Sequence, residues 1–179
     1  MATLVVRSHT APDGTRIPAE LHIDGPGIAY HLRQIGVYYE TWGADRLPRG
    51  MAGRNLSDAD KQQILSAYAP EIERMAREGG YTTKDVVTLY PDTPDLPVLL
   101  SKFDKRHLHS DDEVRFCVAG RGIFSLFPEN APAHDVEIHP GDYIAVPKAM
   151  KHLFTLCPEQ QMTCVRLFAG EQGWVAQYC

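Results

Sequence analysis

The pattern of apolar and polar positions changes character near residue 85 of the chain. Before this point, residues 27–35 repeat apolar side chains at helical spacing, and Gly36 supplies a stop signal. Residues 37–42 then alternate in the manner of a strand. The first part of the chain is therefore predicted to mix helices and strands.

A longer helix is predicted to begin after Ser57, whose side chain can cap it together with Asp60 in a capping box. Pro70 lies inside the helical pattern and lacks a backbone donor. We therefore expect a kink or two short helices that meet there, with an end at Gly79 and Gly80. The apolar face of this segment consists of Ile64, Leu65, Tyr68, Ile72 and Met75.

From residue 85 onward, short apolar segments alternate with Pro, Gly and Asp, which is typical of strands in an all-β fold. The predicted strands are 86–89, 98–103, 113–118, 122–127, 135–138, 143–146, 152–156 and 163–168. Eight strands at this spacing favour a jelly-roll β-barrel with the N-terminal helices packed outside, a mainly β (α+β) fold. Such a barrel has room for a metal ion and one small ligand.

Length and composition favour one domain, because 179 residues with 44% hydrophobic side chains form one well-buried core. Residues 1–84 would be its mixed N-terminal part, and residues 85–179 its barrel with the metal site.

The net charge of -5 and scattered basic residues argue against nucleic-acid binding. No apolar run is long enough to span a membrane, and the polar N-terminus does not resemble a secretory signal. A cytoplasmic protein is therefore expected. The cysteines are expected to be free thiols: Cys117, Cys157, Cys164 and Cys179.

Four side chains form a candidate metal site, since His107, His109 and Glu113 are followed about forty residues later by His152. Imidazole nitrogens with a carboxylate oxygen suit iron, nickel, manganese or zinc, whereas magnesium and calcium prefer oxygen ligands. Asp111 competes with Glu113, although the motif spacing favours Glu113. The other histidines are expected to be structural or solvated: His9, His22, His31, His134 and His139.

Strand alternation extends this site to neighbouring residues. If the register is kept, Arg115 and Cys117 share the face of the histidines, and Phe116 points away. Phe103 has the same parity as the histidines and is predicted to lie beside the metal, whereas Asp112 is expected to solvate the turn. An inward guanidinium needs an anionic partner, which for Arg115 is either a substrate or a core carboxylate.

These residues match two motifs of the cupin superfamily. The first is HxH, three or four residues, Glu, six residues and Gly, here His107, His109, Glu113 and Gly120. The second is represented by Gly141, Pro147 and His152, with Ala149 where the usual pattern has Gly. Within the cupins, residues 37–178 resemble the acireductone dioxygenase family, most strongly in segments 80–87, 102–103, 111–116, 166–168 and 173–174.

The resemblance implies a metal-dependent dioxygenase of methionine salvage, with one divalent ion held octahedrally by His107, His109, Glu113 and His152. Its substrates would be O2 and acireductone (1,2-dihydroxy-3-keto-5-methylthiopentene), which chelates the metal as an ene-diolate. With Fe2+ the family products are 4-methylthio-2-oxobutanoate and formate. With Ni2+ they are methylthiopropionate, formate and CO. The family also implies a monomer.

The same resemblance implies roles for pocket residues. Arg115 is the expected catalytic clamp for the substrate anion, and Phe103, Phe154 and Trp174 would line the substrate pocket. Family members usually have Glu where this chain has Arg106, which parity directs away from the metal.

Two other functions stay open. A cupin dioxygenase could act on a different ene-diol or diketone, which Arg106 and Leu153, at a position where some relatives have an aromatic residue, would favour. A cupin could also bind metal without catalysis.

Overall fold

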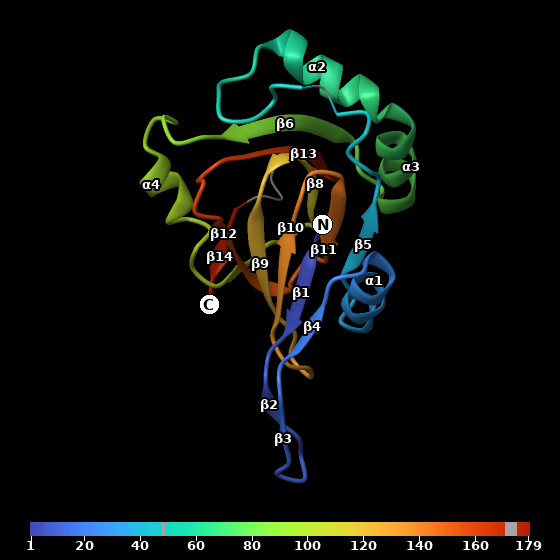
Figure 1. The fold of residues 1–179 in the computed structure, drawn as a ribbon, viewed down its shortest axis with the longest axis vertical. Helices are drawn as coiled ribbons and strands as arrows, with labels where there is room; N and C mark the ends of the chain where they lie inside the picture. Colours follow the sequence, from blue (N-terminus) through green and yellow to red (C-terminus); the bar gives the residue numbers. More distant parts are fainter. Residues whose placement is uncertain (48, 171–174) are drawn as a thin grey trace.

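The computed structural model describes residues 1–47, 49–170 and 175–179. Within these residues, two antiparallel sheets and a projecting hairpin form the β structure (Figure 1). The larger sheet has the order β14 (Gln177–Tyr178), β7 (His107–Leu108), β12 (Lys151–Leu156), β9 (Gly122–Phe127), β10 (His134–Ile138), β1 (Thr3–Val6) and β4 (Glu20–His22). The smaller has β5 (Tyr38–Thr41), β11 (Asp142–Val146), β8 (Glu113–Gly120), β13 (Met162–Phe168) and β6 (Thr83–Leu89). The hairpin pairs β2 (His9–Thr10) with β3 (Arg16–Ile17).

Alternating side chains of the smaller sheet divide the core into two layers. On β8, Cys117 belongs to the cluster between the two sheets, whereas Phe116 and Val118 belong to a second cluster on the other face. Both faces of β11 are covered, so all five of its residues are buried. The predicted parity of β8 is therefore confirmed, and its inward face is the one that holds Glu113 and Arg115.

Two helices cover the outer face of the smaller sheet, α2 (Asp58–Ala67) and α3 (Ala69–Gly79), as Figure 1 shows. The predicted capping box is present, because Asp60 N donates to Ser57 Oγ and Ser57 N donates to the Asp60 carboxylate. The helices meet just before Pro70, and Gly80 ends α3 in the left-handed conformation. The α1 helix (Gly25–Gln34) packs beside β5. None of the helices in the described ranges is both long and apolar enough to span a membrane.

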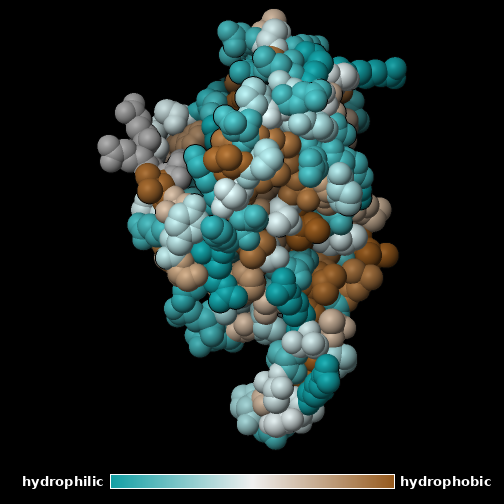
Figure 2. Space-filling model, turned by 90° about the vertical axis from the view of Figure 1, so that its left-hand side faces the viewer, coloured by the Kyte–Doolittle hydropathy of each residue, from teal (hydrophilic) through white to brown (hydrophobic). Residues whose placement is uncertain are grey.

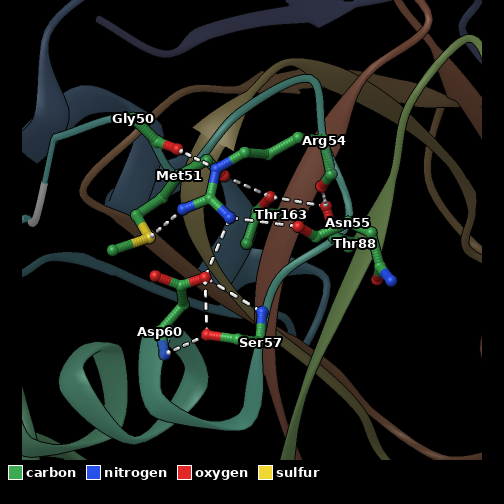
Figure 3. A network of polar contacts seen from close by, with 8 residues as sticks. All are labelled: Gly50, Met51, Arg54, Asn55, Ser57, Asp60, Thr88 and Thr163. Atoms are coloured by element: carbon green, nitrogen blue, oxygen red, sulfur yellow. Dashed lines mark hydrogen bonds and ion pairs between the residues drawn. The ribbon is translucent and has the colours of Figure 1, made fainter.

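A polar network fastens the segment before α2 to the smaller sheet (Figure 3). Arg54 forms an ion pair with Asp60 at 2.8 Å, and its carbonyl oxygen accepts a hydrogen bond from Thr88 on β6. Thr88 contacts Thr163 of β13 at 2.9 Å, and Thr163 donates to the carbonyl of Met51 at 2.7 Å. The network thus joins the segment before α2 to β6 and β13 of the smaller sheet.

Seven of the eight predicted strands are present, but the strand predicted at 98–103 is wrong. That segment instead contains α4 (Leu96–Leu100) and the turn after it. Pro97 occupies the first helical turn, where its fixed φ is favourable, and Leu99 N donates to Asp95 O. A short apolar run does not distinguish a strand from a buried helical turn. The larger sheet also contains β1, β4 and β14, short strands that the hydrophobic pattern did not predict.

Candidate functional site

The four predicted ligands converge between the two sheets. His107 begins β7 and pairs in register with His152 on the neighbouring β12, while Glu113 begins β8 in the facing sheet. His109 lies in the connection between β7 and β8, where its carbonyl accepts a hydrogen bond from Ala149 N. All four side chains are buried, and their ligating atoms lie within 4.8 Å of one another. The structure therefore brings together residues that the sequence separates by up to 45 positions.

Backbone carbonyls set the orientation of two imidazole rings. His107 Nδ1 lies 2.7 Å from Lys105 O, and His152 Nδ1 lies 2.8 Å from Met150 O. Each Nδ1 therefore carries the proton, which leaves Nε2 with a lone pair directed at the centre of the cluster. Among the described residues, the buried His107 Nε2 has no hydrogen-bond partner. A metal ion would satisfy this nitrogen.

The distances within the cluster fit a metal ion. Glu113 Oε2 lies 2.8 Å from His152 Nε2 and 3.0 Å from His109 Nε2. Two ligand bonds of about 2.1 Å at a right angle place their ligand atoms about 3.0 Å apart. Burial lowers the pKa of His107, which favours the neutral ring that can bind a metal. Three imidazoles and one carboxylate thus form a compact donor set for a divalent transition metal.

Arg115 lies next to this donor set and contacts the other oxygen of the same carboxylate. Its guanidinium is 2.8 Å from Glu113 Oε1, with 11% of the Arg115 side chain exposed. Burial alone would raise the pKa of Glu113, but Arg115 and the two neighbouring imidazoles lower it well below the usual value. The core carboxylate considered as a partner for Arg115 is thus Glu113 itself. One carboxylate links the histidines to the inward cation.

A largely apolar pocket of about 210 Å³ opens beside Glu113 and Arg115. Its walls are Val87, Leu89, Leu99, Phe103, Phe154, Met162, Cys164 and Arg166. Arg166 is opposite Arg115 in the β8–β13 register and pairs with Asp85 at 2.7 Å. Figure 2, which faces the α4 side of the molecule, shows hydrophobic residues gathered within a mainly hydrophilic surface. The pocket offers a small apolar space with cations on one wall.

Phe103 and Phe154, the two described residues expected at a substrate pocket, both line this pocket. Phe154 N donates to Phe103 O at 2.8 Å, and the Phe103 ring centroid lies 6.4 Å from that of His107. The strand assignment from which Phe103 was expected near the ligands is wrong, because the residue follows α4 and is not in a strand. Trp174 lies outside the described residues.

Asp112 has a structural function that sequence reasoning missed. One carboxylate oxygen accepts a hydrogen bond from Tyr81 OH at 2.9 Å, and the other accepts from Lys148 N at 2.9 Å. The prediction that Asp112 only solvates the turn is therefore wrong. Tyr81 lies in a segment that resembles the family, but its partner is 31 residues away and no local pattern identifies the contact. Asp111 is not a member of the ligand cluster.

Arg106 points away from the cluster, as parity predicted. Its guanidinium carbon lies 3.9 Å from the centroid of the Phe127 ring, a cation–π contact. The orientation of His107 and His152 depends instead on the backbone carbonyls described above. The family carboxylate that is absent at position 106 is therefore not needed to orient these two rings.

Two facing sheets with a buried His3Glu set between them define a metal-binding cupin. Residues 42–176 match the model of the ARD/ARD' family. The chain is 36% identical to an acireductone dioxygenase of Bacillus pumilus, over 99% of this chain and 97% of the relative. It is 39% identical to an Exiguobacterium sibiricum acireductone dioxygenase, over 89% of each chain. The chain belongs to the ARD/ARD' family, and it is a dioxygenase.

A solved structure agrees with this assignment along the whole chain. It is the acireductone dioxygenase of Bacillus anthracis with a cadmium ion in the active centre, with a TM-score of 0.84 and 38% identity. The match covers 99% of this chain and 98% of that one. The predicted cupin fold is therefore confirmed.

Proposed function

We propose that this protein cleaves acireductone with O2 and that His107, His109, Glu113 and His152 hold one divalent metal ion, Fe2+ or Ni2+. The observation that carries the proposal is the buried four-ligand cluster beside a small pocket with an inward cation. Relatives named acireductone dioxygenase match nearly the full chain, and one of them has a cadmium ion in its active centre.

The bound metal would supply Lewis-acid stabilisation of the ene-diolate and a template for its two adjacent oxygens. Glu113 and the three imidazoles would hold the metal ion between the two sheets. Their side chains are buried, and low solvent access strengthens electrostatic interactions there. The Nδ1 hydrogen bonds of His107 and His152 keep both Nε2 atoms directed at it. The four ligands therefore define where the reacting oxygens of the substrate bind.

Arg115 is the proposed catalytic residue, because it lies within the pocket beside Glu113 and remains charged at working pH. An ene-diolate next to the ligand set brings negative charge to this guanidinium, which can hold and orient it. The clamp thereby favours binding of the dianion over that of a neutral diketone.

Phe103 and Phe154 are proposed to bind the methylthio tail. Both rings line the apolar part of the pocket, and a thioether contacts aromatic rings favourably. These walls exclude water from one side of the substrate while Arg115 binds its charged end. Trp174 retains the role implied by the family resemblance, that of a further pocket residue.

The products are proposed to depend on the metal, in the methionine salvage pathway. With Fe2+ the balanced products are 4-methylthio-2-oxobutanoate and formate, and with Ni2+ they are methylthiopropionate, formate and CO. A cytoplasmic monomer that needs only acireductone and O2 as small-molecule partners completes the proposal; binding to nucleic acid or membrane is not expected.

The deciding experiment adds acireductone anaerobically to protein reconstituted separately with Fe2+ and Ni2+, then admits O2 and analyses products. Keto acid with Fe2+ and CO with Ni2+ are expected. Protein with Glu113→Ala should fail in both reactions, and Asp111→Ala is the matched control that should retain both. Metal-loaded wild-type protein that consumes no O2 with acireductone would refute the proposed substrate.

A further inference from the structure

A second group of metal-ligating side chains lies at the far edge of the larger sheet. Glu20 and His22 are on the outermost strand β4, and His31 is on helix α1, which follows it in the chain. In the sheet order, β12, β9, β10 and β1 separate β4 from the strand that holds His107. Figure 1 shows α1 on the side of the molecule opposite α4. This group is therefore distinct from the His3Glu cluster.

Strand alternation and helix packing bring the three side chains together. Glu20 and His22 are two residues apart on β4 and share one face of the strand. The rings of His22 and His31 are in tilted contact, with centroids 3.8 Å apart and an interplanar angle of 32°. The three residues present ligand atoms that all lie within 4.8 Å of one another. Two separate elements thus contribute to one set of two imidazoles and one carboxylate.

His22 supplies the observation that favours a ligand. Its Nε2 atom is buried and makes no hydrogen bond within the described part of the chain, although Glu20 Oε2 lies only 3.6 Å away. That separation is too long for a hydrogen bond. Two ligand bonds of about 2.1 Å at a tetrahedral angle place their ligand atoms about 3.4 Å apart. The nitrogen and the carboxylate are therefore spaced as two ligands of one ion would be.

We propose that Glu20, His22 and His31 bind a second divalent transition-metal ion, such as Zn2+, Co2+ or Ni2+. Imidazole and carboxylate ligands suit these ions, and water can complete the coordination. The site has three protein ligands, and 53% of the Glu20 side chain is exposed. Its affinity is accordingly lower than that of the buried four-ligand cluster.

The ion would connect the edge strand of the sheet to the helix beside it. β4 has only three residues and pairs with β1 along one side. A bound ion would fix His31 of α1 to this strand, and it would stabilise the native state in proportion to its occupancy. The site therefore acts as a structural clip at a sheet edge, with no part in the oxygen chemistry.

The test counts Co2+ and Zn2+ ions bound to metal-free protein, by titration calorimetry and elemental analysis. Wild-type protein should bind two ions per chain, a tight one and a weaker one. His31→Ala and His22→Gln should each remove the weaker ion, whereas Glu113→Ala should remove the tight ion. His139→Ala, which alters an imidazole paired with Glu137 elsewhere, should retain both ions.

Circular dichroism of each variant distinguishes loss of a ligand from loss of the fold. One ion per chain in the wild type, or two ions in folded His31→Ala protein, would overturn the proposal. Should Glu113→Ala fail to fold, the wild-type, His31→Ala and His139→Ala counts still decide the question. Since none of these counts depends on substrate, the outcome is independent of the proposed dioxygenase reaction.

Discussion

Replacement of Asp112 by Ala tests whether the segment that contains the ligands needs a remote anchor. The carboxylate accepts one hydrogen bond from Tyr81 OH and one from Lys148 N, both at 2.9 Å. One bond is part-buried and the other is exposed, so each contributes about 1 kcal/mol to the free energy of unfolding, less than a buried bond to a charged group, and their loss should cost about 2 kcal/mol. For a chain of this length, that corresponds to a decrease in Tm of roughly 4–8 °C.

Asp112 also immediately precedes the ligand Glu113, and Lys148 lies in the turn before the strand of His152. Loss of the anchor should loosen both sides of the metal site. Because changes to groups that orient ligands cost about 10 to 100-fold in metal affinity, a decrease of that size is expected for the Asp112→Ala protein in a Zn2+ or Co2+ titration.

A double-mutant cycle isolates the contact with Tyr81. Tyr81→Phe removes one of the two hydrogen bonds and should cost about 1 kcal/mol, while the double variant should be little worse than Asp112→Ala alone. Asp111→Ala is the matched control and should change stability by no more than about 0.5 kcal/mol. Equal stability and metal affinity in the Asp112→Ala and Asp111→Ala proteins would refute the anchoring argument.

Three further predictions concern the clamp, a backbone position and acid stability. Arg115→Ala should still bind the metal when the metal is in excess, although loss of the ion pair with Glu113 lowers the metal affinity. The metal-saturated variant should bind acireductone more weakly in anaerobic titrations; wild-type affinity for acireductone would exclude the clamp. Ala149 has a positive φ of 64° where the cupin motif usually has Gly, so Ala149→Gly should raise the free energy of unfolding by about 1 kcal/mol in urea denaturation. Burial opposes ionisation of Asp135, but hydrogen bonds from Arg7 and Ser125 hold its pKa below the usual value. The stabilisation by this carboxylate is therefore fully present above the usual aspartate pKa and is lost as pH falls through the lower folded pKa. Asp135→Asn should reduce stability at neutral pH and flatten this acid dependence of Tm; an unchanged acid limb would contradict it.

The elements that sequence could predict are those specified by local chemistry. Ser57 and Asp60 form a cap within four residues, and Pro70 marks the junction of two helices because it lacks a donor. The strands that contain Glu113 and His152, β8 and β12, follow from the alternation of side chains between the two faces of a strand. The ligand set follows from spacing that strands and cupin motifs share. These features can be predicted without knowing which residues from distant parts of the chain contact one another.

The features that sequence missed depend on distant partners. β1 and β4 are short, and β1 pairs with β10 more than 120 residues away. Asp112 has its function only because Tyr81 and Lys148 meet it in space. The strand prediction for residues 98–103 failed for a different reason, since their apolar run fits either a strand or a helical turn.

The orientation of the ligand imidazoles shows which features of the fold create the metal site. His107 and His152 donate from Nδ1 to the carbonyl two residues earlier, and His134, at the start of β10, does the same with Pro132. The bond is therefore a local property of histidine near the start of a strand, and it does not depend on the residue at position 106. His134 is not in the four-ligand cluster, so the local bond alone does not create a metal site. What creates it is the register of β7 with β12 and the facing position of β8, which direct three Nε2 atoms and one carboxylate to a common point. Variation next to a ligand, as at Arg106, is tolerable for this reason, whereas a change in strand register would not be.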